Sequence, residues 1–177
     1  MAIMLYPVSI EPMRYADLET VLAIDRRCFP TPWHTTAFQT ELTNRAACYL
    51  VARCGESVVG FAGLWVIAGE AHVTTLAVDP AFQGKKIGEK LLICLLEEAV
   101  LRGARRGTLE VREGNRTAQR LYKKYHFREA ALRRSYYTDN GENAVVMWED
   151  DMDRAAFSEH LRAMRHRLRD DGRSRLQ

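Results

Sequence analysis

Three strand-like segments follow one another directly in the first half of the chain. Residues 47–53, 58–68 and 71–78 are rich in apolar and β-branched side chains, and short turns containing Gly55 and Gly69 separate them. Connections this short join antiparallel neighbours, because parallel strands need a crossover of a dozen or more residues. The pattern therefore predicts an antiparallel meander in this part of the chain.

After residue 78 the pattern changes to helix, strand and helix. Apolar side chains recur at helical spacing from Ile87 to Ala99, and Gly103 is a natural stop for that helix. Residues 108–112 then alternate as a strand, and Asn115 can cap a second helix. Two strands joined by a helix of this length pair in parallel through a right-handed crossover.

Local signals predict the remaining elements: a strand over 8–10, helices over 15–27 and 36–42 with Thr35 as the N-cap of the second, and a closing hairpin over 127–137 and 143–149. The predicted fold is mixed α/β (α+β), with a mostly antiparallel sheet, one parallel strand pair and helices against its faces. The chain has 177 residues, 47% of them apolar, which suits one globular domain of ordinary size. We assign residues 1–150 to this domain.

The C-terminal segment, residues 151–177, differs from the rest of the chain. Phe157, Leu161, Met164 and Leu168 recur at helical spacing among seven arginines and five acidic residues. We expect an appended amphipathic helix. The sequence leaves open whether its apolar face packs on its own domain or contacts another copy, and the acidic residues argue against a nucleic-acid-binding arm.

Composition and spacing argue against several classes of protein. A formal net charge of +3 is too small to indicate nucleic-acid binding. No apolar run approaches the roughly 18–20 residues of a membrane-spanning helix, and the N-terminus lacks the pattern of a signal peptide. The cysteines are widely spaced and the histidines form no H-E-x-x-H motif, so we expect no metal site. These features predict a cytoplasmic protein that contacts neither membrane nor nucleic acid directly.

The stretch from Leu76 to Gly88 carries the strongest chemical signal. A strand ends at Asp79, and a short loop with two glycines and two lysines leads into the start of a helix. A helix start presents unpaired N–H groups and partial positive charge, which hold phosphate oxygens, and Lys85 and Lys86 add cationic reach. The residues alone leave two alternatives, a site for a phosphate-bearing ligand and a tight turn before a core helix.

Gln83 and Gly88, placed before an amphipathic helix, resemble the acetyl-CoA loop of the GCN-five-related N-acetyltransferases (GNAT), which usually reads Gln/Arg-x-x-Gly-x-Gly/Ala. Lys86 stands where the family has its middle glycine, and its β-carbon matters only if that position needs a positive φ. The resemblance implies acetyl-CoA as the co-substrate, bound by the strand end, the loop and the next helix start: Leu76, Ala77, Val78, Gln83, Gly84, Lys85, Lys86, Ile87, Gly88 and Asn115.

Further segments, in the same order, resemble the ribosomal-protein-alanine N-acetyltransferases (RimI type) of this family. They are residues 29–33, 109–112, 115, 121–122, 127 and 133–137, and the resemblance covers about residues 8–149. It implies direct transfer of the acetyl group, without a covalent enzyme intermediate, to the N-terminal α-amine of a protein. In the family that acceptor is a ribosomal protein beginning with alanine.

The attacking amine must first lose a proton, and Glu110 is the candidate base. It shares a strand face with Thr108 and Arg112, and we expect partial burial to raise its pKa toward this task. The resemblance places the general base at this position. The alternatives are a surface glutamate paired with Arg112, and His72 as a second base.

The departing thiolate and the oxyanion need donors. Tyr122, on the helix after the Glu110 strand, is the candidate acid, because the resemblance implies that this tyrosine protonates the sulfur of CoA. Its alternative role is core packing. The resemblance also implies that backbone N–H groups of residues 76–78 face the thioester oxygen.

Trp33, Tyr136 and Tyr137 are the predicted acceptor-binding residues. The resemblance implies that their two loops flank a peptide groove, and acidic residues such as Asp139 and Glu142 could attract a basic peptide. Two rival functions stay open, an acetyltransferase for lysine or small amines and a CoA-binding or RNA-associated module without turnover. The sequence leaves the oligomeric state open.

Overall fold

The computed structural model describes residues 7–174, with side chains described over 7–169. This part of the chain alternates strands and helices in the following order: β1 (Val8–Pro12), a 3-10 turn (Tyr15–Asp17), α1 (Leu18–Cys28), α2 (Thr35–Thr43), β2 (Ala47–Cys54), β3 (Ser57–Ile67), β4 (Glu70–Val78), a 3-10 turn (Pro80–Phe82), α3 (Ile87–Leu101), β5 (Arg106–Arg112), α4 (Arg116–Lys124), β6 (Arg128–Arg133), β7 (Ala144–Glu149) and α5 (Ala155–Ser174).

The strands form one seven-stranded sheet in the order β1-β2-β3-β4-β5-β7-β6. β1 pairs with β2 antiparallel, and β7 pairs antiparallel with both β5 and β6. β4 and β5 are the parallel pair. The predicted mixed sheet, with a parallel pair made by the β4-α3-β5 crossover, is therefore confirmed.

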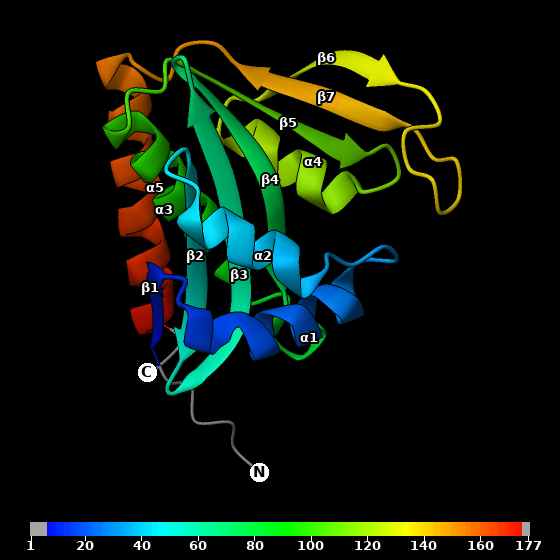
Figure 1. Cartoon of the computed structure of the whole chain (residues 1–177). Coiled ribbons are helices and arrows are strands. Elements are labelled where there is room, and N and C mark those ends of the chain that lie inside the picture. The colour runs from blue at the N-terminus through cyan, green and yellow to red at the C-terminus, as the bar shows by residue number, and fades with distance from the viewer. Residues whose placement is uncertain (1–6, 175–177) are drawn as a thin grey trace. The chain divides into compact units, whose positions relative to one another are not determined.

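The chain divides into two compact units, residues 1–64 with 75–95 and residues 65–74 with 96–177. In the first unit, α1 and α2 lie over β2 and β3 (Figure 1). Val21 and Ile24 of α1 pack with Phe38 of α2 and with Tyr49 and Phe61 of the strands. These side chains are buried because the helices present their apolar faces to the sheet.

The second unit holds β5, β6, β7, α4 and α5. In β5, Gly107, Leu109 and Val111 are buried, whereas Glu110 and Arg112 on the opposite face are partly exposed. Figure 1 shows β5, β7 and β6 side by side, with β6 as the outer strand. The alternation that the sequence predicted for this strand is confirmed.

The apolar face of α5 is buried: Phe157, Leu161, Met164 and Leu168 are each at most 5% exposed. The helix is tied to its neighbours by His160, whose Nε2 lies 2.9 Å from the carbonyl oxygen of Lys124 in α4. Arg165 pairs with Glu97 near the end of α3. The structure thus packs this face on the chain itself.

Two local predictions need correction. Residues 15–17 form a 3-10 turn and α1 begins only at Leu18. α2 begins at Thr35, with His34 at the N-cap position and no side-chain capping bond, so Thr35 is not the cap. The predicted cap of α4 is confirmed, because Asn115 Oδ1 accepts the Ala118 N–H at 3.1 Å.

Candidate active site

The predicted acetyl-CoA loop lies in the first unit, between the end of β4 and the start of α3. Asp79 Oδ1 accepts the Ala81 N–H at 3.0 Å and so caps the 3-10 turn that opens the loop. The Gln83 side chain folds back and donates from Nε2 to the Val78 carbonyl oxygen at 3.0 Å. The ends of strand and loop are therefore held together by side chains of the loop itself.

The loop backbone enters the left-handed region at two positions, Gly84 with φ of 76° and Lys86 with φ of 59°. A residue with a β-carbon adopts such a φ at a cost of roughly 1–2 kcal/mol, whereas glycine does so freely. Lys86 therefore stands at a position where the family's glycine would be unstrained. Lys86 adopts this left-handed conformation although it carries a β-carbon.

Gly88, in the first turn of α3, provides a test of whether a ligand fits here. A β-carbon at Gly88 would lie 3.6 Å from Val78 Cγ2, an ordinary contact, so packing within the protein does not require glycine at this point. A group lying against the helix start would require it, because glycine lets a ligand approach the backbone closely. Lys85, with its ammonium 5.1 Å from the Phe82 ring centroid, adds positive charge to the loop. These residues fit the pyrophosphate of acetyl-CoA.

In the second unit, Glu110 is paired with His72 across the parallel strands. His72 Nε2 lies 2.7 Å from Glu110 Oε2, and Arg133 Nη2 lies 3.4 Å from Glu110 Oε1. The Glu110 side chain is 12% exposed and that of His72 is 38% exposed. The alternative in which Glu110 is a surface glutamate paired with Arg112 is wrong, because the Arg112 guanidinium pairs with Asp139 and Glu142 instead.

The hydrogen bond from His72 lowers the pKa of Glu110, and this effect outweighs the opposing effect of burial. The expectation that burial would raise this pKa is therefore wrong. An ionised carboxylate can only accept hydrogen bonds, so His72 Nε2 carries the hydrogen of this bond, and Nδ1 is the ring atom that accepts a proton when the imidazole acts as a base. The pair can act as a base whose proton-accepting atom is on the imidazole.

Tyr122 of α4 is 8% exposed, and its ring lies 6.1 Å from that of Phe127. Burial, with a smaller contribution from Tyr137, raises the pKa of Tyr122 well above its usual value. The phenol therefore keeps its hydrogen at physiological pH and remains a donor. Gln119, one turn earlier, donates from Nε2 to the carbonyl oxygens of Arg112 and Glu113 at 3.0 and 2.9 Å, which ties α4 to the end of β5.

The β6–β7 loop, which carries Tyr136 and Tyr137, is held by Arg112. The guanidinium bonds Asp139 at 2.9 Å and Glu142 at 3.0 Å, and it lies 3.9 Å from the Tyr137 ring centroid. Burial raises the pKa of Tyr137 to about 12, while Tyr136 is 44% exposed. Asp139 and Glu142 are thus engaged within the protein, which weakens the expectation that they attract a basic peptide.

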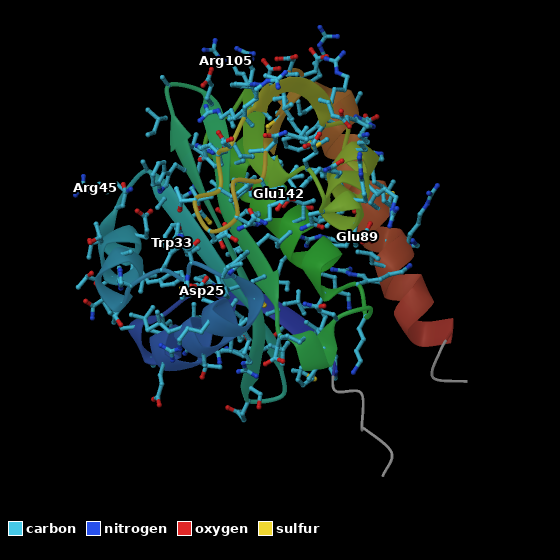
Figure 2. All side chains as sticks on the ribbon, turned by 90° about the vertical axis from the view of Figure 1, so that its right-hand side faces the viewer. Asp25, Trp33, Arg45, Glu89, Arg105 and Glu142 are labelled. Atoms are coloured by element: carbon cyan, nitrogen blue, oxygen red, sulfur yellow. The ribbon has the colours of Figure 1, made fainter. Side chains whose placement is uncertain are left out.

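Trp33 lies in the first unit, in the segment between α1 and α2. The centroid of its ring lies 5.1 Å from that of Phe38 and 6.4 Å from that of Tyr49. Its backbone N–H donates to Asp25 Oδ2 at 2.6 Å, and Figure 2 shows these two residues at neighbouring positions. The sequence patterns missed the contacts that Asp25, Arg112 and Gln119 make beyond their own elements.

The structure thus places the predicted residues in two groups. The first unit holds the β4 end, the loop and Trp33, and the second holds Glu110, Tyr122, Asn115, Tyr136 and Tyr137.

No cluster of three or more His, Cys, Asp or Glu side chains suited to a metal ion occurs over the described residues. In the same part of the chain no helix combines the length and apolar character needed to cross a bilayer.

Comparison with known proteins identifies the family. Residues 18–127 match the acetyltransferase (GNAT) family. A protein of Bacillus subtilis (strain 168) is 38% identical over 141 residues, covering 79% of this chain and 93% of the relative. The N-alpha-acetyltransferase RimI of Mycobacterium tuberculosis is 37% identical over 155 residues, covering 83% of this chain and 95% of that protein.

A solved structure agrees with these sequence matches. The ribosomal-protein-S18-alanine N-acetyltransferase from Escherichia coli superimposes with a TM-score of 0.77 at 30% identity, over 84% of this chain and 96% of that one. This chain therefore belongs to the GNAT family and is an acetyl-CoA-dependent N-acetyltransferase.

Proposed function

We propose that this enzyme acetylates the N-terminal α-amine of a protein, and that the acceptor is a ribosomal protein. Relatives of 33 to 37% identity carry names that state α-amine or ribosomal-protein acetylation. Such an acceptor would be met in the cytoplasm. The observation that carries the proposal is the His72–Glu110 pair, because it sets an imidazole against a carboxylate at hydrogen-bond distance.

The two classes of amine differ greatly in how hard they are to deprotonate. A free α-amine has a pKa near 7.7–8 and a lysine amine one near 10.4, a difference of about 3.5 kcal/mol in the free energy of deprotonation. Imidazole is the side chain whose charge changes closest to physiological pH, so it suits the α-amine far better. This argument favours the α-amine over the lysine side chain.

The acetyl-CoA loop supplies the binding. We assign the pyrophosphate of acetyl-CoA to the backbone N–H groups of residues 84–88 and to Lys85 and Lys86. We assign the pantetheine arm of acetyl-CoA to Asn115 and the β4 backbone at 76–78. Acetyl-CoA itself supplies an activated acyl carbon and a thiolate leaving group. The parallel register of β4 and β5 comprises three residue pairs, of which the last is His72 with Thr108, while β4 continues to Val78. This is consistent with β4 backbone groups that serve the thioester oxygen.

The proton steps then fall to three side chains. The amine nitrogen attacks the thioester carbon and its proton passes to His72 Nδ1, while Glu110 stays ionised and holds the Nε2 hydrogen. The carbon–sulfur bond breaks, and Tyr122 donates to the departing sulfur. Trp33, Tyr136 and Tyr137 bind the first residues of the acceptor.

Peptides that differ only at the first residue test this function. Each is offered with a free or a formylated N-terminus and with one internal lysine, and fragmentation in the mass spectrometer locates the acetyl group. We expect acetylation of the free N-terminus and none of the formylated peptides. Acetyl groups found on lysine in both series would support the rival assignment to lysine.

A further inference from the structure

Asp25, on the last turn of α1, is a carboxyl group in an unusual environment. The residue is 1% exposed, and its Oδ2 accepts the Trp33 N–H at 2.6 Å. Its Oδ1 is buried without a hydrogen-bond partner in the described part of the chain. An unsatisfied buried acceptor costs about 1–3 kcal/mol, so this position is costly to stability as it stands.

Both ends of the segment between α1 and α2 are tied to this one residue. The Asp25 carbonyl oxygen accepts the Phe29 N–H at 2.9 Å, and the Asp25 side chain accepts the Trp33 N–H four residues later. Pro30 and Pro32 lie between them and have no backbone N–H to donate. The two bonds therefore close residues 29–33 into a loop, and the Trp33 ring packs on Phe38 at its far end.

The same turn of α1 also contacts the start of the acetyl-CoA loop. Arg27 Nη1 lies 2.8 Å from Asp79 Oδ2, and Cys28 Sγ donates to the Val78 carbonyl oxygen at 3.3 Å. Three side chains from the end of α1 thus hold the Trp33 loop and the end of β4. This gives the turn a positioning role that apolar packing alone would not require.

We propose that Asp25 is a positioning residue for the acceptor: by holding the Trp33 amide it fixes the loop that selects the first residues of the substrate. The inference rests on the proposed function, since it takes the Trp33 loop as part of the acceptor site. The carboxyl accepts the Trp33 N–H in its neutral and in its ionised form, so the role requires an acceptor oxygen at this position and does not require a charge. Asparagine should replace it and leucine should not.

The experiment compares Asp25→Leu with Asp25→Asn in the full chain. For Asp25→Leu we expect the KM for acceptor peptides to rise about tenfold, the size of one lost hydrogen bond, with the dissociation constant for acetyl-CoA within about twofold. Hydrogen exchange of the Trp33 amide should become fast in Asp25→Leu and stay slow in Asp25→Asn. The asparagine variant should keep the wild-type KM.

A second pair of variants removes the same bond from its other end, should Asp25→Leu fail to fold. Trp33→Pro deletes the N–H, whereas Trp33→Phe keeps it, and both lack the indole ring. The proposal expects a higher acceptor KM for Trp33→Pro than for Trp33→Phe. Equal values, or an Asp25→Leu enzyme with a fast-exchanging Trp33 amide and a wild-type KM, would overturn it. If wild-type enzyme acetylated no α-amine, the proposed function would fail, and the exchange data would still show whether Asp25 holds the loop.

Discussion

His72 Nε2 lies 2.7 Å from Glu110 Oε2, so an imidazole on β4 and a carboxylate on β5 form one hydrogen-bonded unit. The carboxylate fixes which ring nitrogen carries the hydrogen, and it therefore leaves the other nitrogen as the acceptor. This arrangement resembles, in chemical logic, other sites where a carboxylate orients a histidine base. Under the proposed function the two residues act as a single group, and that coupling can be tested.

The first prediction concerns that coupling. His72→Gln and Glu110→Gln should each lower kcat about 10- to 100-fold, since general-base catalysis typically contributes that much or more. Residues that act as a unit are not additive, so the double variant should be about as slow as the slower single variant. Steady-state rates with an α-amino peptide give the comparison. A double variant slowed by the product of the two single effects would show independent roles.

The second prediction concerns stability at low pH. The pKa of Glu110 is lower in the folded protein than its ordinary value of 4.5, chiefly because of the bond from His72. Its contribution to stability is therefore complete above that value and is lost as pH falls through the lower folded value. Urea unfolding should show a gap between wild type and Glu110→Gln that is constant at neutral pH and narrows below about pH 4.5. Glu56→Gln, at an exposed position, is the control, and its free energy of unfolding should stay close to that of wild type over the same pH range.

The third prediction concerns Tyr122. Tyr122→Phe should lower kcat about tenfold or more while acetyl-CoA affinity changes little, because the role proposed for the hydroxyl is to serve the departing sulfur. Burial raises the pKa of this phenol, so no alkaline fall in rate below about pH 10 should come from its ionisation. Tyr125→Phe, at the C-cap position of the same helix and fully buried, is the control. Equal rates for wild type and Tyr122→Phe would assign the proton donor elsewhere.

Local signals in the sequence predicted most of the fold correctly. Asn115 caps α4 because its side chain reaches an N–H three residues ahead, a contact that depends on nothing distant. Gly55, Gly69 and Gly103 all have positive φ, as their positions after strands and a helix indicate. The alternation of apolar and polar residues over 108–112 also predicted which face of β5 carries Glu110.

Contacts that depend on strand register could not be predicted from the sequence. The pairing of His72 with Glu110 follows from a register that aligns His72 with Thr108, and no local pattern specifies that alignment. For the same reason the pKa of Glu110 was expected to rise, since the bond that lowers it joins residues 38 positions apart. Lys86 is a third case, because the φ of a loop residue is set by the loop as a whole.

The fourth prediction concerns Lys86, which has a φ of 59°. Lys86→Gly removes the strained β-carbon and should raise the free energy of unfolding by about 0.5–1 kcal/mol, after allowance for the greater freedom of glycine in the unfolded chain. Lys86→Ala keeps the strain and should not. Both variants lose the ammonium, so both should bind acetyl-CoA more weakly, with less dependence on salt. Calorimetric titration at two salt concentrations measures this, and unchanged affinity in both would remove Lys86 from the binding site.

The last prediction concerns the Arg112 guanidinium, which joins Asp139, Glu142 and the Tyr137 ring. Lysine keeps the charge of arginine but cannot make two divergent hydrogen bonds while stacking on an aromatic ring. Arg112→Lys should therefore loosen residues 134–143, seen as faster hydrogen exchange, and raise the acceptor KM several-fold while acetyl-CoA affinity stays the same. Arg134→Lys, at an exposed position of the same loop, is the control for a change of residue type alone. If both variants behaved alike, the ion pairs of Arg112 would contribute nothing to the acceptor site, and Tyr137 would have to be held by burial of its ring.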